Sequence, residues 1–150
     1  MTTDNSIQVH QSSASEAAVA GLLRGLAAGL AMAAVLVAAG LLVGQPPAST
    51  LAAFAIDGQP LAANGLAGLL GHLAVAGVYG LVWGLVWRAL GGRRAIPAWL
   101  GGLLYGLLLW VVGQLLIRSA GSALMQIAPW ALLAGHLVYG LSLGLLSRQG

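Results

Sequence analysis

The chain of 150 residues is 59% hydrophobic and only 6% charged, whereas an ordinary soluble domain is about one quarter charged. Three acidic residues and six arginines cannot cover a soluble fold of this size, so lipid is expected to be the solvent for most of the chain. The formal charge of +3 comes from arginines that are scattered between apolar runs, which argues against a nucleic-acid partner, and the absence of cysteine excludes thiol chemistry.

The N-terminal stretch up to residue 16 is polar, rich in serine and free of lysine and arginine. It lacks the basic segment that opens a secretory signal peptide, and the apolar run that follows is too long for one. We therefore expect residues 1–16 to be a disordered cytoplasmic tail and residues 17–150 to be one transmembrane domain. His10 lies in this tail and is expected to have no function.

Four apolar stretches follow, each close to the roughly 20 residues that a helix needs to cross about 30 Å of hydrocarbon. Backbone groups in lipid must be paired internally, and apolar runs of this length achieve that only as helices. The predicted fold is therefore all-α, a bundle of four transmembrane helices over residues 21–43, 66–87, 96–117 and 127–146.

The distribution of arginine predicts the orientation of these spans. With four spans, the tail, the middle loop and the C-terminus lie on the same side of the membrane, and that side holds every arginine except Arg118. The arginines on the shared side are Arg24, Arg88, Arg93, Arg94 and Arg148. The positive-inside rule then predicts a multi-pass protein of a bacterial-type cytoplasmic (inner) membrane with both termini in the cytoplasm. Trp87 and Trp99 would mark the inner interface, and Trp130 the outer one.

The first outer loop is the only long connection. In it, Ser49 and Thr50 precede a short apolar run that ends at Asp57 and Gly58, a pattern typical of a short helix with a capping residue and a glycine stop. A short helix on the outer membrane surface and an unstructured loop are both compatible with this segment. Asp57 is expected to be a solvated charge and not half of an acid/base pair.

The second and fourth apolar stretches share a pattern. Residues 78–88 and 138–148 are identical at seven of eleven positions, and the tripeptide Gly-His-Leu occurs in both stretches, displaced in one copy by a helical turn. The first and third stretches match only faintly, and leucine, glycine and valine dominate all four. We interpret the pattern as a duplicated two-helix hairpin whose halves have the same orientation, because each unit has an even number of spans.

Small residues recur at intervals of four along the two repeated stretches, where Gly80 with Gly84 and Gly140 with Gly144 form GxxxG motifs. Such motifs let helix backbones approach closely, so these four glycines are the predicted helix-packing residues. The second and fourth helices are accordingly predicted to form the central pair. Further ladders at residues 21–29, 40–44 and 102–106 are packing signals that a glycine-rich chain also produces by chance.

His72 and His136 lie on the ridges that carry the glycine motifs, so both are predicted to face a wedge between helices. Three interpretations stay open. In the first, each imidazole bonds a carbonyl or a hydroxyl, such as that of Tyr79 or Tyr139, and only ties helices together. In the second, the two histidines bind a cofactor or pigment, with haem b as the best-formed example, although their displacement by one turn and the lack of a nearby arginine count against it. In the third, they form a proton or substrate site.

The absence of certain residue types excludes several classes of function. No aspartate or glutamate lies within a predicted span, which argues against proton-coupled transport, and the chain offers no Ser/His/Asp set and no carboxylate-rich metal cluster. We therefore expect no enzyme activity, no catalytic residue and no metal site. The leading hypothesis is a structural or accessory membrane module, acting as a homo-oligomer or in a larger complex. The alternatives are a haem- or pigment-binding electron-transfer subunit using His72 and His136, and a passive pore or carrier formed by an oligomer.

Two segments carry a resemblance to known proteins. They are Leu-Leu-Ala-Gly-His-Leu-Val-Tyr-Gly-Leu-Ser-Leu-Gly in the last apolar stretch and Gly-Leu-Leu-Tyr-Gly-Leu-Leu-Leu-Trp in the third. The chain resembles small four-helix integral membrane proteins of bacteria and archaea whose function is uncharacterised. The resemblance covers nearly the whole chain through motifs of low complexity. It implies four spans and no activity, so it assigns no site residue.

Overall fold

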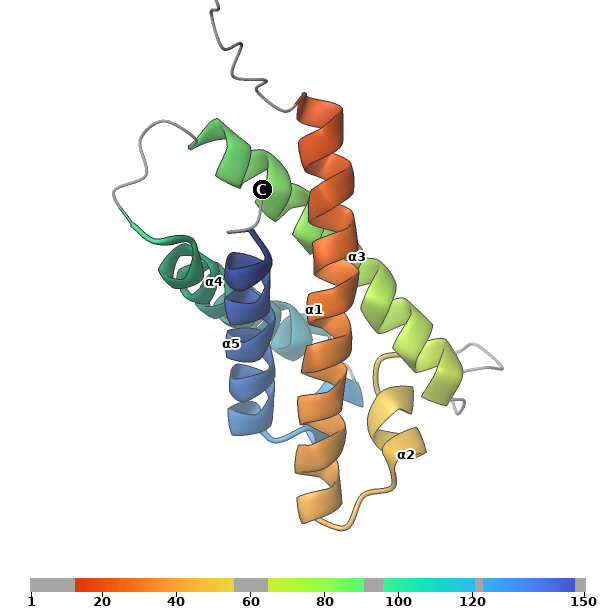
Figure 1. Cartoon of the computed structure of the whole chain (residues 1–150). Helices are drawn as coiled ribbons and strands as arrows, with labels where there is room; N and C mark the ends of the chain where they lie inside the picture. The colour runs from red at the N-terminus through yellow and green to blue at the C-terminus, as the bar shows by residue number, and fades with distance from the viewer. Residues whose placement is uncertain (1–12, 56–64, 91–95, 121–122, 148–150) are drawn as a thin grey trace, which may run out of the picture.

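The computed structural model describes residues 13–55, 65–90, 96–120 and 123–147 (Figure 1). Within these ranges the protein is helical and contains no strand. The four long helices are α1 (Ala14–Leu42), α3 (Gly65–Ala89), α4 (Ala98–Ala120) and α5 (Pro129–Leu146). A short helix α2 (Pro47–Ala52) and a 3-10 helix η1 (Ala123–Gln126) lie in the connections. The predicted all-α fold with four long apolar helices is confirmed.

The start of α1 differs from the prediction. Ser13 is its N-cap, with Oγ accepting a hydrogen bond from the Glu16 N–H at 3.2 Å, while the Glu16 carboxylate accepts one from the Ser13 N–H at 2.7 Å. This reciprocal capping box satisfies two N–H groups that the start of a helix would leave unpaired. Residues 14–16 are therefore helical and not part of a disordered tail, while residues 1–12 of the predicted tail lie outside the described residues.

The far end of α1 turns through a Schellman motif. Gly44 has a φ of 78°, a conformation that glycine adopts at little cost, and the Gln45 N–H bonds the Gly40 carbonyl at 2.9 Å. α2 begins shortly after this turn and has Pro47 at its first position. Of the two alternatives for this loop, the structure shows a helix, but its N-cap is Pro46 and not the predicted Ser49 or Thr50. Asp57 and Gly58 lie outside the described residues.

α1 and α3 cross in direct backbone contact. A Cβ atom added at Gly80 of α3 would overlap the carbonyl oxygen of Gly21 on α1, and one added at Gly84 would overlap that of Ala17. Without a hydrophobic driving force in lipid, this close approach is what lets dispersion forces hold two helices together. The motif at Gly80 and Gly84 therefore packs within the first hairpin.

The second hairpin repeats this arrangement. A Cβ atom at Gly140 of α5 would overlap the carbonyl oxygen of Gly102 on α4, and one at Gly144 would overlap that of Ala98. Both glycine motifs thus find their partner on the other long helix of their own hairpin. Because the motifs are used in this way, they cannot also face each other across the bundle.

The prediction that the second and fourth helices form the central pair is therefore wrong. α1 and α5 lie together in the middle of the bundle, with α3 crossing behind α1 and α4 crossing behind α5 (Figure 1). α3 is joined to α5 by long side chains and not by close backbone approach. The Tyr139 hydroxyl on α5 donates to the Ala76 carbonyl on α3 at 2.6 Å, and the Trp83 indole N–H on α3 donates to Ser147 Oγ at 3.0 Å.

The outer surface of the bundle is apolar. Large aliphatic side chains stand exposed on every long helix, among them Leu30, Leu70, Leu115 and Leu145, and Leu115 is 67% exposed. In water such a continuous apolar surface would cost about 25 cal/mol for each Å². All four long helices are long and apolar enough to span a bilayer, so the chain is a small multi-pass membrane protein.

Candidate functional site

A cavity of about 260 Å³ lies inside the bundle. All four long helices contribute to its wall, together with Phe54 after α2 and Leu124 of η1. Both predicted histidines, His72 and His136, line it, whereas the helix-packing glycines of the two GxxxG motifs do not. The remaining wall is mainly aliphatic and aromatic. The cavity is therefore the place where the chain brings its intramembrane imidazoles together.

His72 is positioned by α1, α3 and the segment that follows α2. It lies on α3, is only 8% exposed, and its Nε2 is 3.0 Å from the Gly29 carbonyl oxygen on α1. The Phe54 ring packs against the imidazole at a tilt of 58°, with a centroid distance of 4.9 Å. A Cβ atom at Gly29 would lie 2.7 Å from the Ala76 Cβ, so the glycine is what allows α3 to come close enough for this bond.

His136 is positioned by its own helix. Its Nδ1 is 2.7 Å from the Leu132 carbonyl oxygen, one turn earlier on α5. The other ring nitrogen, Nε2, points toward α4, where it is 3.9 Å from the position that a Cβ atom would take at Gly113. Both imidazoles therefore bond a backbone carbonyl, which is one of the partners that the sequence suggested, and neither bonds a tyrosine hydroxyl.

Tyrosines on the cavity wall join helices to one another. Besides the bond from Tyr139 to α3, the hydroxyl of Tyr105 on α4 donates to the Tyr79 carbonyl on α3 at 2.9 Å. Tyr79 itself lines the cavity, and the structure describes no bond of its hydroxyl. Sequence reasoning grouped Tyr79 and Tyr139 with the histidines but did not group Tyr105 with them, and it did not foresee Phe54. Tyr105 was signalled only by being the one tyrosine of the third apolar stretch.

Comparison of the chain with protein-family models, curated proteins and solved structures finds no match. Function must therefore be argued from the geometry of the cavity and the bundle.

The fit of a haem to this cavity is poor. The two histidines line the same cavity, but about 260 Å³ is below the 300–1,000 Å³ typical of pockets for drug-sized ligands, and a haem is larger than these. Nε2 of His72 is already held by Gly29, and none of the described residues that line the cavity is an arginine that could meet propionates. Within the described residues, no three histidine, aspartate or glutamate side chains gather as metal ligands. The geometry favours a smaller occupant.

Proposed function

We propose that this protein is a non-catalytic module of the cytoplasmic membrane, a structural or accessory subunit that works as a homo-oligomer or within a larger membrane complex. The observation that carries the proposal is the use of polar side chains inside the bundle. His72, Trp83, Tyr105 and Tyr139 each bond a group on a different helix. These groups fix the helices relative to one another and do not converge on a single reacting atom.

The exposure of α4 supports assembly with further helices. Of the four long helices it is the least enclosed by the rest of the bundle, and Leu104, Leu108 and Leu115 stand exposed along it. Lipid can cover this face, but a helix from a second copy or from another subunit would cover it with tighter packing.

The assembly is tested by sedimentation of the full chain in mild detergent. The absorbance of the protein and the Soret absorbance of haem are recorded together. We expect a discrete species whose protein mass is a multiple of the chain mass, with no Soret absorbance. A monomer with a Soret band that disappears in both His72→Ala and His136→Ala would overturn the proposal in favour of the haem hypothesis.

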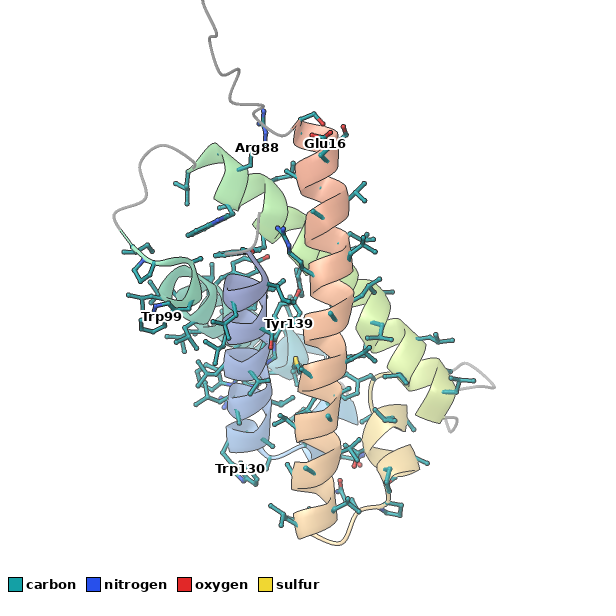
Figure 2. The ribbon with its side chains drawn as sticks, viewed as in Figure 1. Glu16, Arg88, Trp99, Trp130 and Tyr139 are labelled. Carbon is teal, nitrogen blue, oxygen red and sulfur yellow. The ribbon has the colours of Figure 1, made fainter. Side chains whose placement is uncertain are left out.

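The places of the described charged and aromatic residues support an orientation in the membrane. Glu16 and Arg88 are at one end of the bundle and Trp130 is at the opposite end (Figure 2). The last turn of α5 is at the end that holds Arg88 (Figure 1). The positive-inside rule places that end in the cytoplasm, so we propose that both termini are cytoplasmic.

Cysteine labelling tests this orientation, because the natural chain has no cysteine to interfere. Ser15 at the start of α1 and Met125 in η1 are both exposed and lie at opposite ends of the bundle. In intact cells we expect a membrane-impermeant maleimide to label Met125→Cys fully and Ser15→Cys only after lysis. The reverse pattern would invert the topology, and labelling of both in intact cells would contradict a four-span arrangement.

We further propose that the two hairpins arose by duplication of one. In the first hairpin, Gly80 packs between Gly21 and Gly25 of α1. In the second hairpin, Gly140 packs in the same way between Gly102 and Gly106 of α4. The sequence repeat lies on α3 and α5, whereas the matching contact partners lie on α1 and α4, and both support a common origin.

The same register explains the displacement of the two histidines by one turn. In the first hairpin, the Ala76 carbonyl contacts Gly25. In the second hairpin, the corresponding contact to Gly106 is made by the His136 carbonyl. His136 therefore occupies the position in the second half that Ala76 occupies in the first. His72 then corresponds to Leu132. The two histidines therefore do not occupy corresponding positions of the two halves, and they do not form a symmetric pair of ligands.

A further inference from the structure

The hydrogen bonds of the two imidazoles determine what the cavity can recognise. A carbonyl oxygen only accepts, so Nε2 of His72 and Nδ1 of His136 must carry the hydrogen in their bonds to Gly29 and Leu132. In a neutral imidazole the other nitrogen then has no hydrogen and acts as an acceptor. Among the described residues that line the cavity there is no carboxylate to stabilise a second proton on either ring.

Both rings line the cavity, and their acceptor nitrogens are Nδ1 of His72 and Nε2 of His136. Among the described residues, neither nitrogen has a hydrogen-bond donor as partner. An acceptor with apolar surroundings gains free energy from a donor, so an occupant that supplies hydrogens to these nitrogens is favoured over one that presents only carbonyls or hydrocarbon.

The approach to the cavity is apolar. Val75 on α3 and Leu116 on α4 both line it and are more than half exposed on the surface of the bundle. They face the region that hydrocarbon covers in a membrane, so the bilayer is the expected source of an occupant. Further apolar side chains line the cavity beside the two histidines, namely Met32, Phe54 and Leu132.

We propose that this cavity binds a hydroquinone, the reduced head group of a lipid-soluble quinone, with its hydroxyl groups donating to His136 Nε2 and His72 Nδ1. Apolar space of about 150 Å³ is enough for a benzene ring, so about 260 Å³ holds a substituted one. An apolar tail on that ring leaves between Val75 and Leu116. The oxidised quinone presents only acceptor oxygens to acceptor nitrogens, so the site discriminates between the two redox forms of one molecule.

The test uses tetramethylhydroquinone and tetramethylbenzoquinone as probes, which have the same ring and substituents and differ by two hydrogens. Binding to the full chain in lipid nanodiscs is measured by calorimetry without oxygen. We expect the hydroquinone to bind at least about tenfold more tightly than the quinone, because two hydrogen bonds are made in one case and two acceptors stay unmatched in the other.

His136→Phe is the decisive variant, because it keeps a ring of similar size and removes only a bond within α5. We expect it to reduce the preference for the hydroquinone several-fold, while His10→Phe, a matched change in the N-terminal stretch, leaves the preference unchanged. His72→Phe should act in the same direction, and circular dichroism checks that each variant keeps its helices.

Equal binding of the two redox forms to the parent chain would overturn the proposal, as would undiminished discrimination in a folded His136→Phe protein or the absence of any binding. A prenyl alcohol that binds as tightly as the hydroquinone would overturn the assignment to a hydroquinone. These readouts are independent of the orientation and assembly proposed above, so each proposal can fail by itself.

Discussion

Isoleucine at Gly80 or at Gly140 is expected to prevent the affected hairpin from closing. The added Cβ alone would overlap a backbone carbonyl on the facing helix, and a branched side chain cannot turn away from it. Overpacking in a core typically costs about 1–3 kcal/mol, and here the obstructing atom is backbone, so we expect at least about 3 kcal/mol. The measurement is the midpoint of unfolding in mixed micelles of rising sodium dodecyl sulfate content, followed by circular dichroism and by tryptophan fluorescence.

Gly113→Ala is the matched control for these variants. It also adds a side chain to a helical glycine, but there the new Cβ meets only His136 Nε2, at 3.9 Å. Since alanine favours the helix over glycine by about 1 kcal/mol, the control should unfold at the parent midpoint or slightly later. If Gly80→Ile has the same midpoint of unfolding as the control, the close crossing of α1 and α3 does not exist in the membrane. Unequal losses for Gly80→Ile and Gly140→Ile would count against two equivalent hairpins.

The number and place of the long helices could be predicted because the thickness of hydrocarbon sets the length of an apolar run, whatever the neighbouring helices do. The glycine motifs could be recognised for a similar local reason, as small residues on one ridge. Which ridge they face depends on the partner helix. The decisive signal was present in the ladders of the first and third stretches, where Gly21 and Gly102 turn out to be the partners of Gly80 and Gly140.

The cavity could be predicted only in part. Helical spacing placed His72 and His136 on the ridges that face other helices, and both do line one cavity. Their partners, the carbonyls of Gly29 and Leu132, could not be read from the sequence because every residue has a carbonyl and only the crossing geometry decides which one is in reach. Phe54 was equally hidden, since it comes from a loop whose path is set by the Schellman turn at Gly44.

The second large effect is expected for Trp83→Ala. Trp83 is 3% exposed, and its ring stacks on Trp87 at a centroid distance of 5.0 Å and packs at 5.3 Å against Tyr105 of α4. Its indole N–H reaches Ser147 beyond the end of α5. Truncation would leave a void where α3, α4 and α5 meet, and such aromatic-to-alanine changes cost about 3–5 kcal/mol. We expect the dodecyl sulfate midpoint to fall accordingly and proteolysis of the native protein to accelerate.

Two conservative variants separate the packing of Trp83 from its hydrogen bond. Trp83→Phe keeps most of the ring and loses the indole N–H, whereas Ser147→Ala removes the acceptor of the same bond and leaves the ring in place. Each should cost about 1 kcal/mol, and the double variant should cost less than the sum, because both changes break one interaction. Since helices in lipid are held chiefly by close packing, most of the loss in Trp83→Ala should come from the void. If Trp83→Phe were as damaging as Trp83→Ala, the bond to Ser147 would instead be what fastens α3 to α5.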